Sequence, residues 1–187
     1  QAGITDNVIE LMVDRLRKFS QEAQHLLCLA ACIGNEFDLE SLAAISRITV
    51  PHAATTLLSM LRSGLLIPLN DAYKWTPHLN WQQLESEEAA IGSETALPRY
   101  RFSHDRVQQA AYSLLPPASK ADVHYQIGNA LLQNPGYQDK TNTLFEVAKH
   151  FYLARTLFNT SQDLLRYADI QCQAGQRARG DVLVDGG

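Results

Sequence analysis

Three adjacent residues, Ser103, His104 and Asp105, are the side chains of this sequence best placed to contact a phosphate. They lie where a short β-like run, residues 100–102, passes into a helical run that ends near Leu115. Unpaired N–H groups at a helix start attract phosphate oxygens, and a histidine there can donate a ring N–H to the same anion. A charge-assisted hydrogen bond of that kind is worth roughly 1.5–3 kcal/mol. His104 is therefore a candidate phosphate contact.

The same three residues also have a purely structural explanation. Ser103 is a residue type that caps helix N-termini, and Asp105 is favourable beside the positive end of the helix dipole. His104 would then fill a groove among apolar neighbours. The local pattern by itself favours this structural role, so the choice between the two depends on the surrounding domain.

Composition and charge describe an ordinary globular protein. Nearly half of the 187 residues are hydrophobic and the net charge is −4, and this length holds one large domain or two small ones. No apolar run approaches the roughly 18–20 residues that cross a bilayer, and no segment has the pattern of a signal peptide. We therefore expect a cytoplasmic protein without a membrane partner. The negative charge also argues against nucleic acid as a partner.

The cysteine pattern favours buried thiols over disulfides. Cys28 and Cys32 lie one helical turn apart in an apolar segment, which is typical of proteins in a reducing compartment. His25 lies on the same predicted helix side. Zinc bonds are only about 2.0–2.3 Å long, whereas His25 and Cys32 are about 10 Å apart along the helix axis. We therefore predict an apolar core stripe here and no metal site.

Helical periodicity predicts four helices in the first third of the chain, with a small sheet after them. The first helix covers residues 7–18. Ser20 and Gly34 mark the start and end of the second helix, and Asp38 caps the third. Pro51 marks the start of the fourth helix and Gly64 its end. Strands are expected at residues 65–69, 73–75 and 99–102. Residues 76–98 are polar and rich in Glu, and we predict a long acidic wing loop there.

This order, three helices and then a small sheet, is that of a winged helix domain, which we assign to residues 20–116. Residues 117–179 are predicted to be the start of a TPR-like α-solenoid, so the fold class is mainly α. The expected helices and caps are residues 118–133; 144–157, with a Thr143–Glu146 capping box; and 162–178, capped by Ser161. One helical hairpin cannot bury its own faces, so further repeats should follow. The helical pattern stops near Arg179, and we interpret residues 180–187 as an artificial or truncated end of a fragment.

The sequence contains no recognisable catalytic or nucleotide-cradling motif. There is no GxxxxGK[ST] and no GxGxxG. The acidic wing lacks the spacing of a calcium loop, and no Ser/His/Asp or Cys/His arrangement indicates a nucleophile. We therefore predict that this chain is not an enzyme, with no catalytic residue, no metal and no cofactor bound by the chain alone.

A winged helix also suggests DNA binding, but the charges oppose it. The candidate recognition helix, residues 51–62, has one full positive charge, on Arg62, whereas readers of duplex DNA use several Arg or Lys. The wing adds carboxylates that repel phosphate, at Glu85, Glu87, Glu88 and Glu94. We expect this fold to contact protein. The alternatives are a DNA-binding transcriptional regulator and a passive interaction scaffold. A His104 side chain buried among apolar neighbours would indicate the scaffold.

Four segments together resemble one family: LAACIGNEFDLESLA at 29–43, LRSGLLIP at 61–68, YRFSHDRVQQAAYSLLP at 100–116 and VHYQIGNALL at 123–132. They are similar to the region after the ATPase module in large bacterial signalling proteins of the STAND class. Those proteins join a serine/threonine-kinase-like domain, an AAA-type ATPase, a helical-repeat region, a GAF domain and a histidine kinase. The resemblance covers most of residues 1–178 and implies that residues 1–19 are a linker helix from an upstream ATPase module.

The resemblance also implies a role for the residues at the helix start. In related STAND switches, including plant immune receptors, a winged helix domain carries a Met-His-Asp motif whose histidine contacts the β-phosphate of bound ADP. Ser103, His104 and Asp105 match that motif, with serine in place of methionine. By resemblance, His104 senses the phosphate and Asp105 orients the local backbone, while the parent protein binds ADP or ATP with Mg²⁺.

These inferences combine into one expectation of function. We expect a non-catalytic regulatory fragment of a nucleotide-controlled signal-transduction ATPase and sensor kinase of the two-component type. The fragment docks on the ATPase domain and couples the ADP/ATP state to the output. Its expected partners are the intramolecular ATPase and kinase domains, together with proteins bound through the helical repeats.

Overall fold

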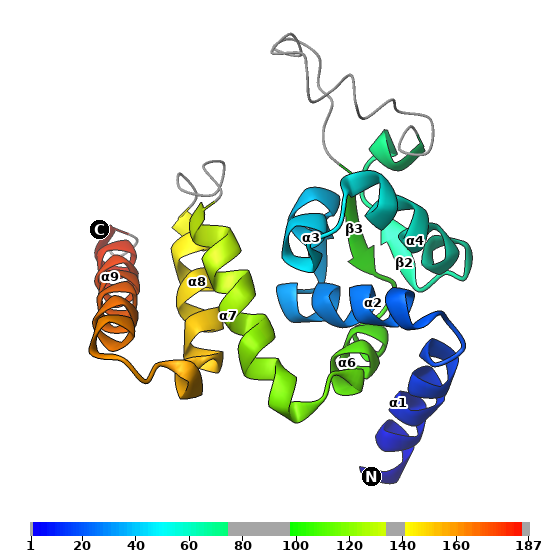
Figure 1. Cartoon of the computed structure of the whole chain (residues 1–187), viewed down its shortest axis with the longest axis horizontal. Helices are drawn as coiled ribbons and strands as arrows, with labels where there is room; N and C mark the ends of the chain where they lie inside the picture. Colours follow the sequence, from blue (N-terminus) through cyan, green and yellow to red (C-terminus); the bar gives the residue numbers. More distant parts are fainter. Residues whose placement is uncertain (1, 75–97, 134–140, 185–187) are drawn as a thin grey trace, which may run out of the picture. The chain divides into compact units, whose positions relative to one another are not determined.

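The structure is a computed structural model that describes residues 2–74, 98–133 and 141–184. The chain divides into two compact units, Gln1–Leu115 (unit 1) and Pro116–Gly187 (unit 2). It is mainly helical, and unit 1 contains a small three-stranded sheet (Figure 1). Residues 76–97 of the predicted wing loop and the predicted break after residue 133 lie outside the described residues.

Unit 1 begins with four helices that one strand interrupts. Its elements within the described residues are α1 (Ala2–Leu16), α2 (Gln21–Ile33), β1 (Glu36–Asp38), α3 (Leu39–Ser46), α4 (Val50–Arg62), β2 (Leu66–Pro68), the 3-10 turn η1 (Asp71–Lys74), β3 (Arg99–Phe102) and α6 (Asp105–Leu114). Ser20 caps α2 by accepting from the amide of Ala23, and Asp38 caps α3 by accepting from the amide of Ser41. Both predicted caps are thereby confirmed. Gly64, with φ +71°, follows the end of α4 in the left-handed region that favours glycine.

The sheet has the strand order β1-β3-β2, and both pairings are antiparallel. The central strand β3 alternates, with Arg99 and Arg101 exposed and Tyr100 and Phe102 buried. Phe37 of β1 packs on both buried rings, with centroids 5.9 and 5.8 Å away. The sequence pattern predicts no strand at β1, because three residues between two helices are too few to show alternation.

One predicted strand is wrong. Tyr73 and Lys74 lie in η1 instead of a strand, and Trp75 lies outside the described residues. The Lys74 ammonium pairs with the Asp71 carboxylate at 2.6 Å within this turn. Asn70 and Asp71 favour such local turns, because their side chains bond to nearby groups in place of a strand partner.

The core of unit 1 forms where the helices meet one face of the sheet. Its fully buried side chains include Leu26, Leu27, Leu39, Leu42, Leu57, Met60, Leu65, Leu66 and Tyr100. Cys28 and Cys32 belong to this core, as predicted, and burial raises the pKa of Cys28 to about 11. His25 is exposed, so it does not share the buried stripe with the two cysteines.

The first helix is part of the packing of unit 1. It begins at Ala2, earlier than the predicted residue 7, and ends at Leu16, whose side chain is fully buried. Helix α1 packs against α6, and Arg15 donates to the backbone carbonyl of Ser63 after α4. The segment predicted as a linker at residues 1–19 thus contributes to the same compact unit.

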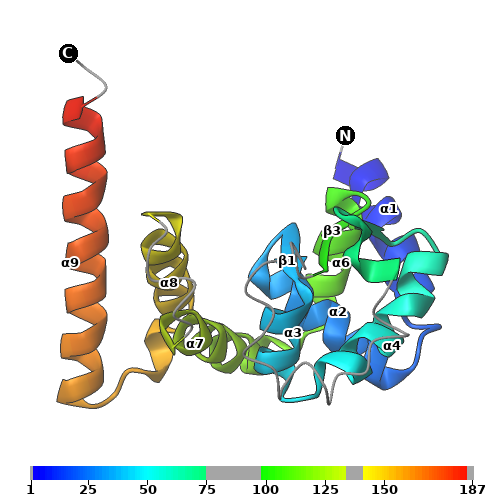
Figure 2. The ribbon, with the colours of Figure 1, turned by 90° about the horizontal axis from the view of Figure 1, so that it is seen from above.

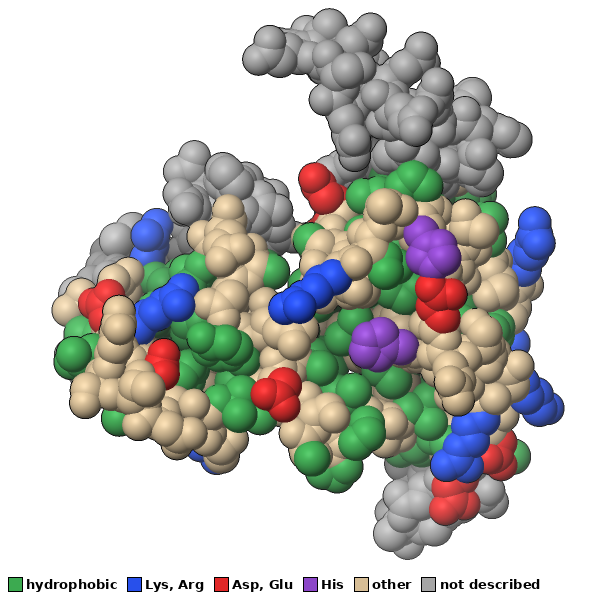
Figure 3. Space-filling view, viewed as in Figure 1, with side chains coloured by type: hydrophobic (Ala, Val, Ile, Leu, Met, Phe, Trp, Pro, Cys, Tyr) green, Lys and Arg blue, Asp and Glu red, His purple; other side chains and the backbone are tan. Residues whose placement is uncertain are grey.

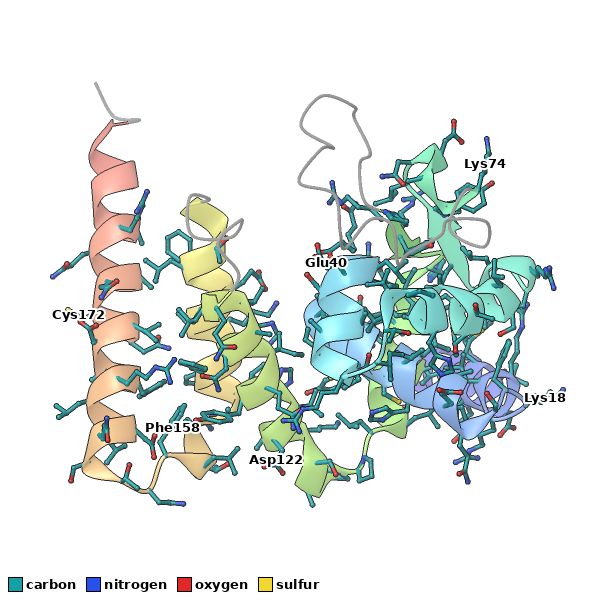
Figure 4. All side chains as sticks on the ribbon, turned by 45° about the horizontal axis from the view of Figure 1, so that its top comes forward. Lys18, Glu40, Lys74, Asp122, Phe158 and Cys172 are labelled. Atoms are coloured by element: carbon teal, nitrogen blue, oxygen red, sulfur yellow. The ribbon has the colours of Figure 1, made fainter. Side chains whose placement is uncertain are left out.

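The described residues of unit 2 form three helices and a 3-10 turn: α7 (Pro117–Gln133), α8 (Thr141–Leu153), η3 (Arg155–Leu157) and α9 (Ser161–Val184). Helix α8 packs against both α7 and α9, as the two views show (Figure 1, Figure 2). Phe158 lies in the turn between α8 and α9 (Figure 4). The helical character predicted for this part of the chain is present, whereas several of the predicted boundaries differ.

The corrections concern helix ends. Helix α8 ends at Leu153, before the predicted residue 157, and Arg155–Leu157 form the 3-10 turn η3. Helix α8 begins at Thr141, so Thr143 lies inside it and the predicted capping box is wrong. The hydroxyl of Thr160, not Ser161, accepts from the amide of Asp163 at the start of α9, at 3.2 Å. Helix α9 continues to Val184, past the predicted end near residue 179, because an isolated glycine weakens a helix without ending it.

The interface between α7 and α8 is tight at one glycine. A Cβ added at Gly128 would overlap the ring of Phe151. Phe151 belongs to a cluster with Tyr125, Phe158 and Tyr167, in which neighbouring ring centroids lie 5.2–6.0 Å apart. Close backbone approach and stacked rings therefore hold the helices of unit 2 together.

Candidate phosphate-contact site

The candidate site lies where β3 passes into α6 in unit 1. His104 is the N-cap of α6: its backbone is extended (φ −158°, ψ 146°), and its Nδ1 accepts from the amide of Arg106 at 3.1 Å. The prediction that Ser103 caps this helix is wrong. The amide of Ser103 donates to the carbonyl of Leu65 at 3.0 Å, which extends the strand pairing and leaves Ser103 one position before the cap.

The cap determines how the His104 ring presents its second nitrogen. Because Nδ1 accepts a hydrogen bond, the neutral ring carries its proton on Nε2. His104 is exposed, so Nε2–H can donate to a ligand. The explanation in which His104 fills a groove among apolar neighbours is therefore wrong, and the feature expected of a passive scaffold is not observed at this residue.

Rigid elements support the His104 backbone on both sides. The preceding strand β3 is paired with β1 and β2. The following helix α6 packs against α1 and α2, with Val107, Ala110 and Ala111 buried. Gln108 Nε2 also donates to the carbonyl of Ala31 at 3.2 Å. A side chain held between a central strand and a packed helix has little freedom, which suits it to a contact of fixed geometry.

The charges at this helix start are mixed. Asp105 is exposed in the first turn, where a carboxylate offsets part of the positive end of the helix dipole. The guanidinium of Arg106 donates to Gln109 at 3.3 Å. An anion here would therefore be bound by the ring N–H of His104 more than by the dipole. The described residues bring together no group of three or more His, Cys, Asp or Glu that could hold a metal.

The exposed surface of α4, the candidate recognition helix, does not favour DNA. The hydroxyls of Thr55, Thr56 and Ser59 donate to carbonyls of their own helix, at 2.9, 3.0 and 3.1 Å. His52 is paired with Glu22 of α2. On the face shown in Figure 3, Lys and Arg side chains are scattered and do not form a continuous stripe.

Sequence reasoning missed a second histidine feature, in unit 2. His124 on α7 and His150 on α8 are both buried and their rings face each other. Each occupies a core position of its helix, His124 in line with Ile127 and His150 beside Phe151. A signal was available: both histidines recur at helical spacing with buried apolar residues, which predicts a buried ring.

Comparisons with known proteins find a distant relative. The chain is 26% identical over 209 aligned residues to the hybrid signal transduction histidine kinase G of Dictyostelium discoideum. The alignment covers 98% of this chain and 6% of that protein, so the chain spans a small part of the curated relative's length. No protein-family model and no solved structure matches. Within residues 2–74, 98–133 and 141–184, no helix combines the length and apolarity needed to cross a bilayer.

Proposed function

We propose that this chain is a non-catalytic, cytoplasmic regulatory region of a signal-transduction kinase whose output is controlled by a bound nucleotide. The distant relative is a hybrid signal transduction histidine kinase, and its similarity extends along nearly the whole chain, which supports a signalling role. By the STAND resemblance, the parent protein also carries an AAA-type ATPase module and a serine/threonine-kinase-like domain.

The proposal assigns a winged helix fold to unit 1 and a TPR-like fold to unit 2. In unit 1, α2, α3 and α4 precede β2 and β3, and β1 completes the sheet, an order that supports a winged helix. In unit 2, each helix packs against the next along the chain, which supports the start of a helical repeat. The winged helix would dock on the ATPase domain, and the repeats would bind partner proteins.

The observation that carries the proposal is the exposed Nε2 of His104 at the start of α6. In the ADP state this nitrogen donates to a phosphate oxygen of the nucleotide, which the ATPase domain holds with Mg²⁺. Asp105 orients the adjoining backbone. Exchange of ADP for ATP breaks this hydrogen bond between His104 and the phosphate. Because only the closed state makes this hydrogen bond, ADP favours that state by roughly 10- to 100-fold.

Replacing His104 by asparagine in the full-length protein tests this role. Asparagine is a good N-cap, so α6 keeps its cap, whereas the imidazole N–H is lost. We expect higher basal kinase output, because the closed ADP state loses a contact. His25→Asn is the matched control, since His25 is an exposed histidine of the same unit on another helix. Equal output from the wild type and the His104→Asn protein would contradict the phosphate-contact role.

The class of the parent protein can be checked independently. A P-loop encoded upstream of this chain would support nucleotide control, and a parent protein without one would overturn the ATPase part of the proposal. The alternative function, direct DNA binding, predicts a salt-dependent mobility shift of duplex DNA by this chain. The scattered basic residues and the intrahelical bonds of α4 lead us to expect no shift.

A further inference from the structure

Unit 2 buries two histidines against each other. His124 on α7 and His150 on α8 are 3% and 1% exposed, their Nδ1 atoms lie 2.9 Å apart, and their ring centroids lie 5.1 Å apart. A hydrogen bond between two Nδ1 atoms needs one ring to donate and the other to accept. The bond therefore joins the two helices only while at least one Nδ1 is unprotonated.

The other ring nitrogen of His150, Nε2, has a poor environment for hydrogen bonding. Nε2 is buried, and no residue in the described part of the chain forms a hydrogen bond with it. The Glu146 carboxylate lies 3.9 Å away, which is too long for a hydrogen bond. The same carboxylate oxygen is bonded to Lys149 Nζ at 3.0 Å and is partly exposed to solvent. A positive charge on His150 would thus be buried with weak compensation.

Burial and neighbouring charges keep both rings neutral. Burial, followed by the charges of Lys149 and Lys120, lowers the pKa of His124 to about 4. Burial, followed by the charges of His124 and Lys149, lowers the pKa of His150 to about 3. Desolvation disfavours the charged form of a histidine, and like charges add to that effect.

The elements that carry the pair, and those packed beside them, hold charged side chains of both signs. The charged groups on these elements include Lys120 and Asp122 on α7, Glu146 and Lys149 on α8, Arg155 on η3, and Asp163, Arg166 and Asp169 on α9. Arg155 lies over the ring of Tyr152 and Arg166 over the ring of Phe151, the two residues that follow His150. Among the described residues, Glu146 is the carboxylate beside a ring, 3.9 Å from His150 Nε2, and it is already bonded to Lys149. The charges of Lys120 and Lys149 therefore act against protonation of the rings with little compensation.

We propose that the His124–His150 pair is an acid-sensitive latch, which holds α7 against α8 while the rings are neutral and releases the helices as the rings are protonated. Two protonated rings would direct Nδ1–H groups at each other across 2.9 Å and repel. Release would also open the close contact of Gly128 with Phe151. The latch does not depend on the phosphate contact in unit 1, so either proposal can fail alone.

The pH range of release follows from the pKa values of the two histidines in the open and in the closed form. Above pH 6.5, the ordinary pKa of histidine, the open and closed forms are both unprotonated and the latch has its full strength. Below pH 6.5 the opened helices bind protons first, and each histidine favours opening up to about tenfold per pH unit. The loss levels off as the buried rings titrate near pH 4 and pH 3. Between pH 7 and 5.5 the opening equilibrium should rise roughly 50-fold.

Amide hydrogen exchange of the whole chain at pH 7.0 and 5.5, corrected for intrinsic exchange rates, measures this opening directly. We expect protection of α7 and α8 to fall roughly 50-fold, with α2 and α6 of unit 1 as the internal reference. A fall of less than about threefold in α7 and α8, or an equal fall in both units, would overturn the latch.

Two further measurements separate the latch from general acid sensitivity. The double variant His124→Leu with His150→Leu should lose the pH dependence of α7 and α8, whereas the exposed-histidine control His25→Gln should keep it. A double variant that opened with acid like the wild type would contradict the latch. If the double variant does not fold at pH 7, the ring resonances of the wild type decide. Midpoints below pH 5 support the latch, and midpoints near 6.5 overturn it.

Discussion

Histidine has opposite surroundings in the two units of this chain. In unit 1, His104 is exposed at the start of α6, where one ring nitrogen caps the helix and the other faces solvent. In unit 2, His124 and His150 are buried and bonded to each other. An exposed ring on a rigid support can contact a ligand at constant pH. A buried pair responds to protons only when its helices open. Position relative to solvent, and not residue type, therefore decides which signal a histidine can report.

The largest expected effect is the response of the two units to acid. Lowering the pH from 7 to 5 should reduce the free energy of unfolding of unit 2 by about 3.5 kcal/mol, because two histidines with lowered pKa values bind protons on unfolding. Urea-dependent hydrogen exchange, analysed separately for α7–α8 and for α2–α6, measures it. If unit 1 lost stability as steeply as unit 2, the contrast between buried and exposed histidines would be lost.

The next largest effect concerns the close contact of Gly128 on α7 with Phe151 on α8. Gly128→Ala should destabilise unit 2 by about 2 kcal/mol, because the new methyl group overlaps the ring of Phe151 in a packed interface. Gly175→Ala on α9 is the matched control, since a Cβ there meets no atom within 4 Å. It should stabilise the helix by about 0.5–1 kcal/mol. Thermal unfolding of the two variants should therefore shift in opposite directions, and a shift in the same direction would contradict the close approach of α7 and α8.

A smaller effect separates the two roles of His104. His104→Ala should cost about 0.5–1 kcal/mol of stability in unit 1, because α6 loses the cap bond to the amide of Arg106. His104→Asn should retain most of that stability, since asparagine caps helices well. Denaturant unfolding of the chain measures both. Equal stability in the wild type and the His104→Ala chain would show that the cap bond contributes nothing.

The smallest effect concerns an exposed histidine with a charged partner. His52→Gln removes the pairing with Glu22, whose side chain, like that of His52, is about half exposed. Exposed pairs of this kind contribute little, so the free energy of unfolding should change by less than about 0.5 kcal/mol. A change in the free energy of unfolding above about 1 kcal/mol would mean that an exposed histidine can matter to stability as much as a buried one.

Much of the fold could be predicted because its signals are local. Ser20 and Asp38 were recognisable as caps, and the apolar spacing around Cys28 and Cys32 located a buried helix face. The strand β1 was not predictable, since its pairing with β3, more than 60 residues away along the chain, decides it. Such long-range pairing leaves no periodic signal in so short a segment.

The candidate site was predictable in position but not in detail. The run into α6 marked His104 and Asp105, whereas the amide of Ser103 bonds to Leu65 and so moves the cap to the histidine. The sequence does not show which of two adjacent polar residues will cap a helix when a distant carbonyl competes for the first. The His124–His150 pair was missed for a related reason, because contact between two helices depends on how they pack.

The rate at which ADP leaves the full-length protein depends directly on the proposed contact between His104 and the nucleotide phosphate. We expect the His104→Asn protein to release ADP roughly tenfold faster than the wild type, because the closed state loses one charge-assisted hydrogen bond while α6 keeps its cap. The His25→Asn control should release ADP at the wild-type rate. Identical ADP release from the wild type and the His104→Asn protein would contradict the claim that His104 contacts the nucleotide phosphate.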